Sequence, residues 1–230
     1  MALHQVTSIL KLFVDSADAA QWHLPPGCPR VQGVTTNPSI VLQAKLPVSL
    51  DGYCGLVQRA AALGVAELML QLPQAGVPEA QHWLGVLQPL AAASGVQLTF
   101  KLPCHPDWAD TLAAVQAAGL PSLLTGLSNP VQLLWAQERA ATYVAPYIGR
   151  LQADGRDVWA LLKACVAVQN AGGPKLLAAS IKSSDVLAQL IAIGAYGATV
   201  RPEFAASLAL DPLTIAAMAQ FDADTRASLA

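Results

Sequence analysis

The stretch that decides the fold covers residues 67–101 and reads ELMLQLPQAGVPEAQHWLGVLQPLAAASGVQLTFK. Short apolar runs at its two ends, residues 67–70 and 96–100, have the length and composition of buried strands. Between them, residues 80–93 carry apolar side chains at three- and four-residue spacings, as an amphipathic helix does. A strand, a helix and a second strand in this order predict one parallel β-α-β unit.

The same unit recurs along the rest of the chain. We expect strands at residues 12–14, 33–34, 67–70, 96–100, 123–124, 143–145, 176–179 and 198–200. We expect helices at residues 56–63, 80–93, 108–118, 131–141, 158–171 and 184–193, with Asp107 and either Ser183 or Ser184 as N-caps. Residues 212–230 are expected to form a final helix and a tail.

Eight units without an interdomain linker favour a closed barrel. The 230 residues also fall within the usual size of one α/β barrel. An open doubly wound sheet would need a glycine-rich phosphate loop after the first strand, and neither GxGxxG nor a Walker motif follows Asp15. We therefore predict an α/β fold in which residues 1–230 form a single (β/α)₈ TIM barrel, the catalytic domain, with a C-terminal helix.

The composition excludes several classes of protein. Hydrophobic residues make up 54% and charged residues 12%, which is incompatible with disorder. No run of 18 uninterrupted apolar residues and no signal peptide are visible, so we expect a cytoplasmic protein without a membrane partner. A net charge of −2 without a basic block argues against nucleic acid. The four cysteines form no CxxC pair, so neither a metal site nor disulfides are expected.

Polar residues follow the predicted strands, where a barrel places its catalytic groups. Any one of them could simply cap a helix, but as a set they should converge on one mouth of the barrel. They are Asp15, Asn37, Gln71, Lys101, Thr125, Arg150 and Ser180.

Lys101 is the sharpest single signal, because it directly follows the apolar run of residues 96–100. A lysine that is buried, charged and unpaired is costly, and desolvation lowers its pKa. The neutral amine is the form that attacks a carbonyl. The residues alone leave a structural alternative open, in which Lys101 reaches solvent or pairs with an aspartate.

Residues 33–39 read GVTTNPS and form the second signal. The residue before a proline is kept out of the helical region, and Pro38 can then begin a helix at its first position. This directs the Asn37 amide into the mouth, able to donate to and accept from sugar hydroxyls. A turn with an Asn cap and no contact to a ligand is the alternative.

Taken in order, these motifs resemble the transaldolase superfamily. FVDSAD at residues 13–18, GVTTNPS at 33–39 and FKLP at 100–103 carry the resemblance, and APYIGR at 145–150 and AASIK at 178–182 extend it. It covers residues 12–200, nearly the whole chain. GVTTNPS is the specific motif, whereas the others support it by falling in the right sequence.

The resemblance implies a role for each candidate residue. Lys101 would form a Schiff base with the carbonyl of a ketose phosphate such as fructose 6-phosphate. Asp15 and Asn37, with Thr35, would hold the donor hydroxyls, and Asp15 would also assist proton transfer. Arg150, Ser180 and Lys182 would bind the phosphate. A water held by Gln71, Thr125 and Tyr147 would shuttle protons. No cofactor is implied, and the implied assembly is a homo-oligomer such as a decamer of two pentamers.

Four pocket positions separate two branches within the superfamily. Transaldolases proper usually have Glu, Ser, Phe and Asn where this chain has Gln71, Ala145, Tyr147 and Leu123. The chain thus resembles the small fructose-6-phosphate aldolase branch. The Tyr147 hydroxyl would position a water or donate a proton, which would let free dihydroxyacetone leave without an acceptor sugar.

Three alternatives stay open. The chain could be a true transaldolase that transfers dihydroxyacetone to an aldose phosphate, an enzyme for a non-phosphorylated ketone, or an inert barrel that binds a sugar phosphate. Departures from the family pattern at Cys104, His105 and Arg201 bear on the substrate more than on the fold. Arg201 stands where a small or apolar residue is expected, and it could either add to phosphate binding or partly block the mouth.

Overall fold

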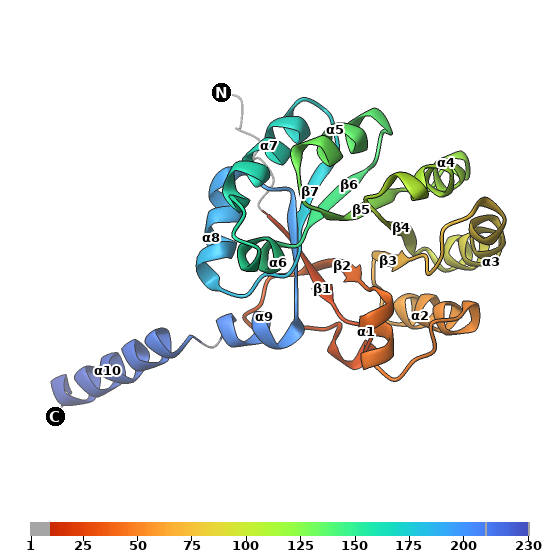
Figure 1. Cartoon of the computed structure of the whole chain (residues 1–230). Coiled ribbons are helices and arrows are strands. Elements are labelled where there is room, and N and C mark those ends of the chain that lie inside the picture. Colours follow the sequence, from red (N-terminus) through yellow and green to blue (C-terminus); the bar gives the residue numbers. More distant parts are fainter. Residues whose placement is uncertain (1–9, 210, 230) are drawn as a thin grey trace, which may run out of the picture.

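A computed structural model describes residues 10–209 and 211–229 and contains a closed barrel of parallel strands (Figure 1). Each strand pairs with its neighbours in chain order, and β8 closes the ring against β1. The strands are β1 (Lys11–Asp15), β2 (Val31–Thr35), β3 (Glu67–Gln71), β4 (Gln97–Pro103), β5 (Ser122–Leu127), β6 (Tyr143–Pro146), β7 (Lys175–Ala178) and β8 (Gly197–Val200).

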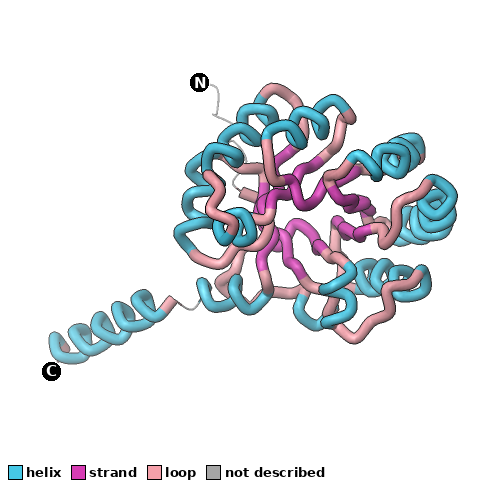
Figure 2. Tube along the Cα trace, in the orientation of Figure 1, coloured by secondary structure: helices cyan, strands magenta, loops and turns pink. Residues whose placement is uncertain are grey.

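Helices surround the barrel on the outside, and Figure 2 shows them as an outer ring around the strands. The α-helices are α1 (Pro38–Gln43), α2 (Leu50–Ala62), α3 (Val77–Ser94), α4 (Ala109–Ala117), α5 (Pro130–Glu138), α6 (Ile148–Ala153), α7 (Val158–Asn170), α8 (Ser184–Ile193), α9 (Pro202–Ala209) and α10 (Pro212–Ser228). Two short 3₁₀ helices, η1 (Ala19–Gln21) and η2 (Pro106–Trp108), complete the described elements.

The predicted TIM barrel is confirmed, with all eight strands and a C-terminal helix at the expected places. The N-cap expected at Asp107 is wrong. His105 instead caps η2, and α4 begins one residue later than predicted, at Ala109. Ser183 caps α8, as one of the two alternatives had it.

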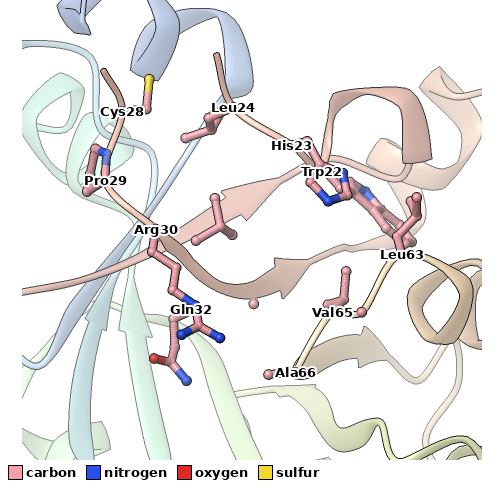
Figure 3. Close-up of a pocket in the computed structure, with 13 residues that line it drawn as sticks. Trp22, His23, Leu24, Cys28, Pro29, Arg30, Gln32, Leu63, Val65 and Ala66 are labelled. Atoms are coloured by element: carbon pink, nitrogen blue, oxygen red, sulfur yellow. The ribbon is translucent and has the colours of Figure 1, made fainter. Parts of the chain in front are cut away.

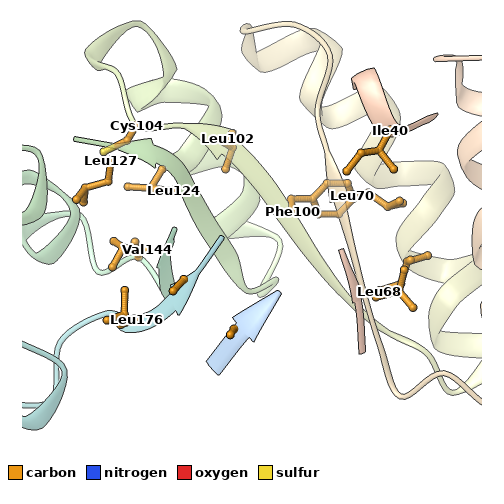
Figure 4. Packing of buried hydrophobic residues seen from close by; sticks show 14 of the residues in the cluster. Ile40, Leu68, Leu70, Phe100, Leu102, Cys104, Leu124, Leu127, Val144 and Leu176 are labelled. Atoms are coloured by element: carbon orange, nitrogen blue, oxygen red, sulfur yellow. The ribbon is translucent and has the colours of Figure 1, made fainter. Parts of the chain in front are cut away.

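Side chains that alternate between the two faces of each strand form two hydrophobic cores, one between the barrel and the helices and one inside the barrel. Outward-facing side chains pack against the helices in the larger core, part of which Figure 4 shows, with Leu68 and Leu70 from β3 beside Phe100 from β4. Inward-facing side chains such as Phe13 and Met69 fill the barrel itself. Because successive side chains of a strand point to opposite faces, the residues two positions further on also face inward. This alternation places Asp15 and Gln71 on the inside, at the C-terminal ends of β1 and β3.

The C-terminal helix α10 lies apart from the barrel (Figure 1), and none of its described residues is buried. The stretch Pro202–Ser228 is long and apolar enough to cross a membrane by length and composition alone. It is not one regular helix, because the Asp211 side chain caps α10 and Pro212 is the first residue of that helix. A carboxylate cap and a proline begin a new helix rather than continue the preceding one.

Candidate active site

A cavity of about 720 Å³ opens at the C-terminal mouth of the barrel. Seven of the residues predicted for the site, from five strand ends, line it together with a run of α1 residues. The lining consists of Asp15, Asn37, Pro38, Ser39, Ile40, Gln43, Gln71, Tyr147, Arg150, Ala179, Ser180, Ile181, Lys182, Thr199 and Arg201. The cavity is where barrel enzymes hold their substrates.

Lys101 lies on β4 and is 4% exposed. It pairs in register with Gln71, which lines the cavity, while Lys101 itself is not part of the lining. Burial lowers the pKa of the Lys101 amine, and the Asp15 carboxylate opposes this shift. Nζ makes no hydrogen bond to another described residue, which leaves its lone pair free when the amine is neutral. These surroundings favour the nucleophilic form of the amine.

Asp15 is fixed by a short chain of hydroxyl groups. The Thr35 hydroxyl donates to Asp15 Oδ1 at 2.7 Å and lies 2.6 Å from the Thr199 hydroxyl. Thr35 is buried and does not line the cavity, so it contacts Asp15 rather than the cavity space. Asp15 thus presents a carboxylate of fixed orientation toward the space that a substrate would fill.

Tyr147 lies between Thr125 and Arg150. The Thr125 hydroxyl donates to the Tyr147 hydroxyl at 2.5 Å, and the Arg150 guanidinium stands over the Tyr147 ring, 4.8 Å from its centroid. Burial raises the pKa of the Tyr147 phenol, against the lowering effects of the Thr125 hydrogen bond and the Arg150 charge. The phenol is therefore protonated at neutral pH and able to donate a proton.

Asn37 both caps a helix and lines the cavity, which were the two alternatives that the sequence left open. It is the N-cap of α1, and its side-chain oxygen accepts a hydrogen bond from the Ile40 N–H at 3.0 Å. It also lines the cavity. Because the oxygen is engaged by the helix, the amide nitrogen is the group left to donate to a ligand.

The three residues expected to bind phosphate converge at Gly149. A Cβ added to Gly149 would lie 2.9 Å from both Ser180 Oγ and Lys182 Cε, too close for any real side chain. Ser180 has a φ of 61°, a left-handed conformation that is uncommon outside glycine. Strain of this kind gathers at ligand sites, where the surrounding structure maintains it. Arg150 follows Gly149 on α6, so one guanidinium, one ammonium and one hydroxyl lie at the same edge of the cavity.

Gln43 was not predicted for the site, and the sequence left the role of Arg201 open between phosphate binding and blocking of the mouth. Arg201 follows β8 and lines the cavity, and its Nη2 donates to Gln43 Oε1, 3.2 Å away at the end of α1. Thr199 and Ser39 also line the cavity without having been predicted. Gln43 is an exposed residue on a short helix, and nothing in its local sequence distinguishes it from any other surface glutamine.

Two residues near Lys101 in the sequence lie outside the cavity lining. His105 is an exposed cap, 3.3 Å from an Asp107 carboxylate oxygen. Cys104 is buried, and burial raises the pKa of its thiol to about 11, so it is not a thiolate nucleophile at neutral pH. A second cavity of about 520 Å³ lies between the β1–β2 connection with the first residues of β2 and the loop that precedes β3 (Figure 3), and none of the predicted site residues lines it.

The chain is similar in sequence to bacterial proteins named probable transaldolase. One from Roseobacter denitrificans (strain ATCC 33942 / OCh 114) is 30% identical over 94% of this chain and 96% of that protein. One from Bartonella bacilliformis is 30% identical over 89% of this chain and 91% of that protein. A third, from Caulobacter sp. (strain K31), is 28% identical over 92% and 94%. No family model matches the chain.

Solved structures show the fold alone, because their sequence identity to this chain is low. A tryptophan synthase chain from M. tuberculosis has a TM-score of 0.55 at 16% identity, covering 88% of this chain and 86% of that one. A 4-hydroxy-2-oxoglutarate aldolase/2-deydro-3-deoxyphosphogluconate aldolase has a TM-score of 0.52 at 11% identity, covering 86% and 90%.

The fold and the cavity at its C-terminal mouth define an α/β-barrel enzyme. With relatives 30% identical along almost its whole length, the chain belongs to the transaldolase superfamily. Its function is of the aldolase or transaldolase type.

Proposed function

We propose that this protein is a class I aldolase that cleaves and forms a carbon–carbon bond of a ketose phosphate such as fructose 6-phosphate. Lys101 would hold the dihydroxyacetone unit as an imine. The observation that carries the proposal is a buried lysine with a lowered pKa, beneath a cavity lined by Asp15 on one side and by Arg150 on the other.

The reaction begins at the Lys101 amine. Nζ attacks the ketose carbonyl, the resulting carbinolamine loses water, and a protonated imine forms. A base removes the proton of the C4 hydroxyl, the C3–C4 bond breaks, and its electron pair moves into the imine to give an enamine. The aldehyde phosphate leaves. Protonation of the enamine at C3 and hydrolysis of the imine then release dihydroxyacetone and restore the amine.

Asp15 and Tyr147 are the groups we assign to proton transfer. Asp15 is held by Thr35 and faces the cavity, so it can hold a donor hydroxyl and accept a proton. Tyr147 is protonated at neutral pH and is oriented by Thr125. We assign to Gln71, Thr125 and Tyr147 the water that carries protons between the substrate and this side of the cavity.

The phosphate would lie at the edge formed by Arg150, Ser180 and Lys182. A guanidinium presents a planar fork of donors that matches phosphate, and the ammonium adds charge. Asn37 would donate its amide N–H to a donor hydroxyl, since its oxygen caps α1. The Tyr147 phenol supports release of dihydroxyacetone to water over transfer to an acceptor, and so supports the aldolase over the transaldolase alternative.

The test is trapping of the imine. Wild-type protein and the Lys101→Met variant would be reduced with borohydride in the presence of dihydroxyacetone or fructose 6-phosphate, and the mass would be measured intact and after peptide mapping. We expect one stable adduct on Lys101 in the wild type and none in the variant. A Lys101→Met variant that keeps cleavage activity, or an adduct on another lysine, would contradict the proposal.

Adding an acceptor aldose phosphate separates the two activities. Cleavage of fructose 6-phosphate without an acceptor, with free dihydroxyacetone as product, supports the aldolase. Turnover only when the acceptor is present would identify a transaldolase, and the imine on Lys101 would stand in either case.

A further inference from the structure

We propose that Arg201 binds a second anionic group of the substrate, so that the site selects ketoses phosphorylated at both ends. The second phosphate would lie on C1, next to the carbonyl carbon. This inference rests on the proposed function and deepens it, because it names the class of donor that the cavity takes.

Arg201 extends from the end of β8 past β1 to α1, the helix that follows β2. It leaves the end of β8, and its Nη2 donates to Gln43 Oε1 at 3.2 Å, a contact that joins residues 158 positions apart. Both residues line the cavity. Among residues 10–209 and 211–229 no carboxylate lies within 4 Å of the Arg201 guanidinium, so its charge has no ion-pair partner there. The neutral Gln43 amide orients the guanidinium without neutralising it.

The order of the strands gives the direction along which a substrate would lie. In a ring of eight strands, β2 and β6 are four steps apart in either direction, on opposite sides of the barrel. Arg150 lies on α6, after β6, whereas Gln43 lies on α1, after β2. Lys101 is on β4, two steps from each of them. A ketose joined to Lys101 through C2 would therefore have the β2 side of the mouth at one end and the β6 side at the other.

The two arms of such a ketose are chemically different. The long arm, C3 to C6, would reach the phosphate edge at Arg150, Ser180 and Lys182. The short arm, C1, would then point toward the β2 side, where Asn37 and the Arg201–Gln43 pair lie. A guanidinium at that place matches a phosphate ester on C1.

The charges of the cavity fit two phosphates better than one. Three cationic side chains line it, Arg150, Lys182 and Arg201, against one carboxylate, Asp15. Arg150 and Lys182 suffice for one phosphate dianion at their edge. Arg201 is then not needed for a single phosphate, and its bond to Gln43 directs its guanidinium toward α1 rather than toward α6.

The experiment compares two probes, fructose 6-phosphate and fructose 1,6-bisphosphate. We expect the wild type to cleave the bisphosphate with the higher kcat/KM. Arg201→Met should lower kcat/KM for the bisphosphate about ten- to a hundredfold, the effect of losing a charge-assisted hydrogen bond, and lower it far less for the monophosphate. Arg201→Lys should recover part of the loss, because it keeps the charge and loses the fork. Arg139→Met makes the same change outside the cavity and should leave both rates unchanged.

Each outcome decides the inference separately from the proposed function. Equal losses on the two probes in Arg201→Met, or a wild type that prefers the monophosphate, would overturn the second anion site. Imine trapping with uncharged dihydroxyacetone shows independently whether Lys101 reacts. If it does not react, calorimetry of the two phosphates on Lys101→Met protein still tests Arg201. Tighter binding of the bisphosphate that Arg201→Met abolishes supports the inference, and equal binding of both refutes it.

Discussion

Lys101 concentrates the energetic cost of the site in one side chain. Its amine is buried on an inward-facing position of β4, and the Asp15 carboxylate, which is itself held by Thr35, is the charge that favours the protonated form of this amine. A charge in such a place is retained at the expense of stability. Function and stability are therefore expected to pull in opposite directions at this residue.

Lys101→Met is expected to make the protein more stable at neutral pH. Burial lowers the pKa of Lys101 in the folded state below its ordinary value of 10.5, which the unfolded chain keeps. Between the folded-state and the unfolded-state pKa, the unfolded chain binds more protons, so the stability of the wild type rises with pH. Replacing the buried amine by an apolar group of similar length should stabilise by about 1 to 4 kcal/mol. The measurement is denaturant unfolding of both proteins from pH 7 to 10.5, with the difference shrinking as the pH rises.

The matched control is Lys163→Met, an exposed lysine on α7. It should leave the unfolding free energy almost unchanged over the same pH range. If Lys101→Met were clearly less stable than wild type at pH 7, Lys101 would have to be a well-compensated structural lysine, and the assignment of a neutral amine would fall with it.

At the scale of elements, the sequence predicted site residues that lie at or shortly after the strand ends but not Gln43, which lies on a helix surface. Asp15 ends the apolar run of β1, and Lys101 is a charged residue between Phe100 and Leu102 within β4; sequence alone reveals both. Strand order then brings them to one mouth. The contact between Arg201 and Gln43 joins a strand end to a helix surface, and no local pattern encodes it. For the same reason the sequence could place Thr35 near the site but could not tell that its hydroxyl serves Asp15.

The close approach of α6 to the loop after β7 yields a prediction about an element rather than a functional group. Gly149→Ala should raise KM for fructose 6-phosphate by about tenfold or more, because its Cβ would displace Ser180 Oγ and Lys182 Cε, each 2.9 Å away. The displaced groups are those assigned to the phosphate, so the KM for free dihydroxyacetone and glyceraldehyde should change far less. Steady-state kinetics of synthesis and cleavage measure both.

Gly85→Ala is the comparison for this variant, since a Cβ at Gly85 on α3 meets no atom within 4 Å. It should leave both KM values as they are, and on helix propensity it should be slightly stabilising. Similar KM values in wild type and Gly149→Ala would mean that the edge at Arg150 does not bind the phosphate.

For the whole molecule, the exposed helix α10 is the feature that the barrel does not explain. Leu213 is 82% exposed and Phe221 66%, and Met218 lies exposed between them. Apolar patches of this kind mark a surface that another molecule covers. Seventeen residues of helix span about 25 Å, less than the roughly 30 Å of a bilayer core, and Asp222 and Asp224 lie inside the helix. We therefore expect a second copy of the chain, rather than a membrane, to cover α10, as in the homo-oligomer expected from the sequence.

We accordingly predict that Phe221→Glu lowers the molecular mass in solution. A carboxylate at this position would be desolvated if α10 packs against another copy, and burying an unpaired charge costs several kcal/mol. Size-exclusion chromatography with light scattering should give a multiple of the 23.9 kDa chain mass for the wild type and a smaller multiple for the variant. Ala223→Glu adds the same charge at a neighbouring α10 position that is not one of the large apolar side chains Leu213, Met218 and Phe221. This control variant should keep the wild-type mass. A wild type that elutes as a single chain would contradict assembly through α10. A large mass that is unchanged in Phe221→Glu would show that the copies meet through another surface.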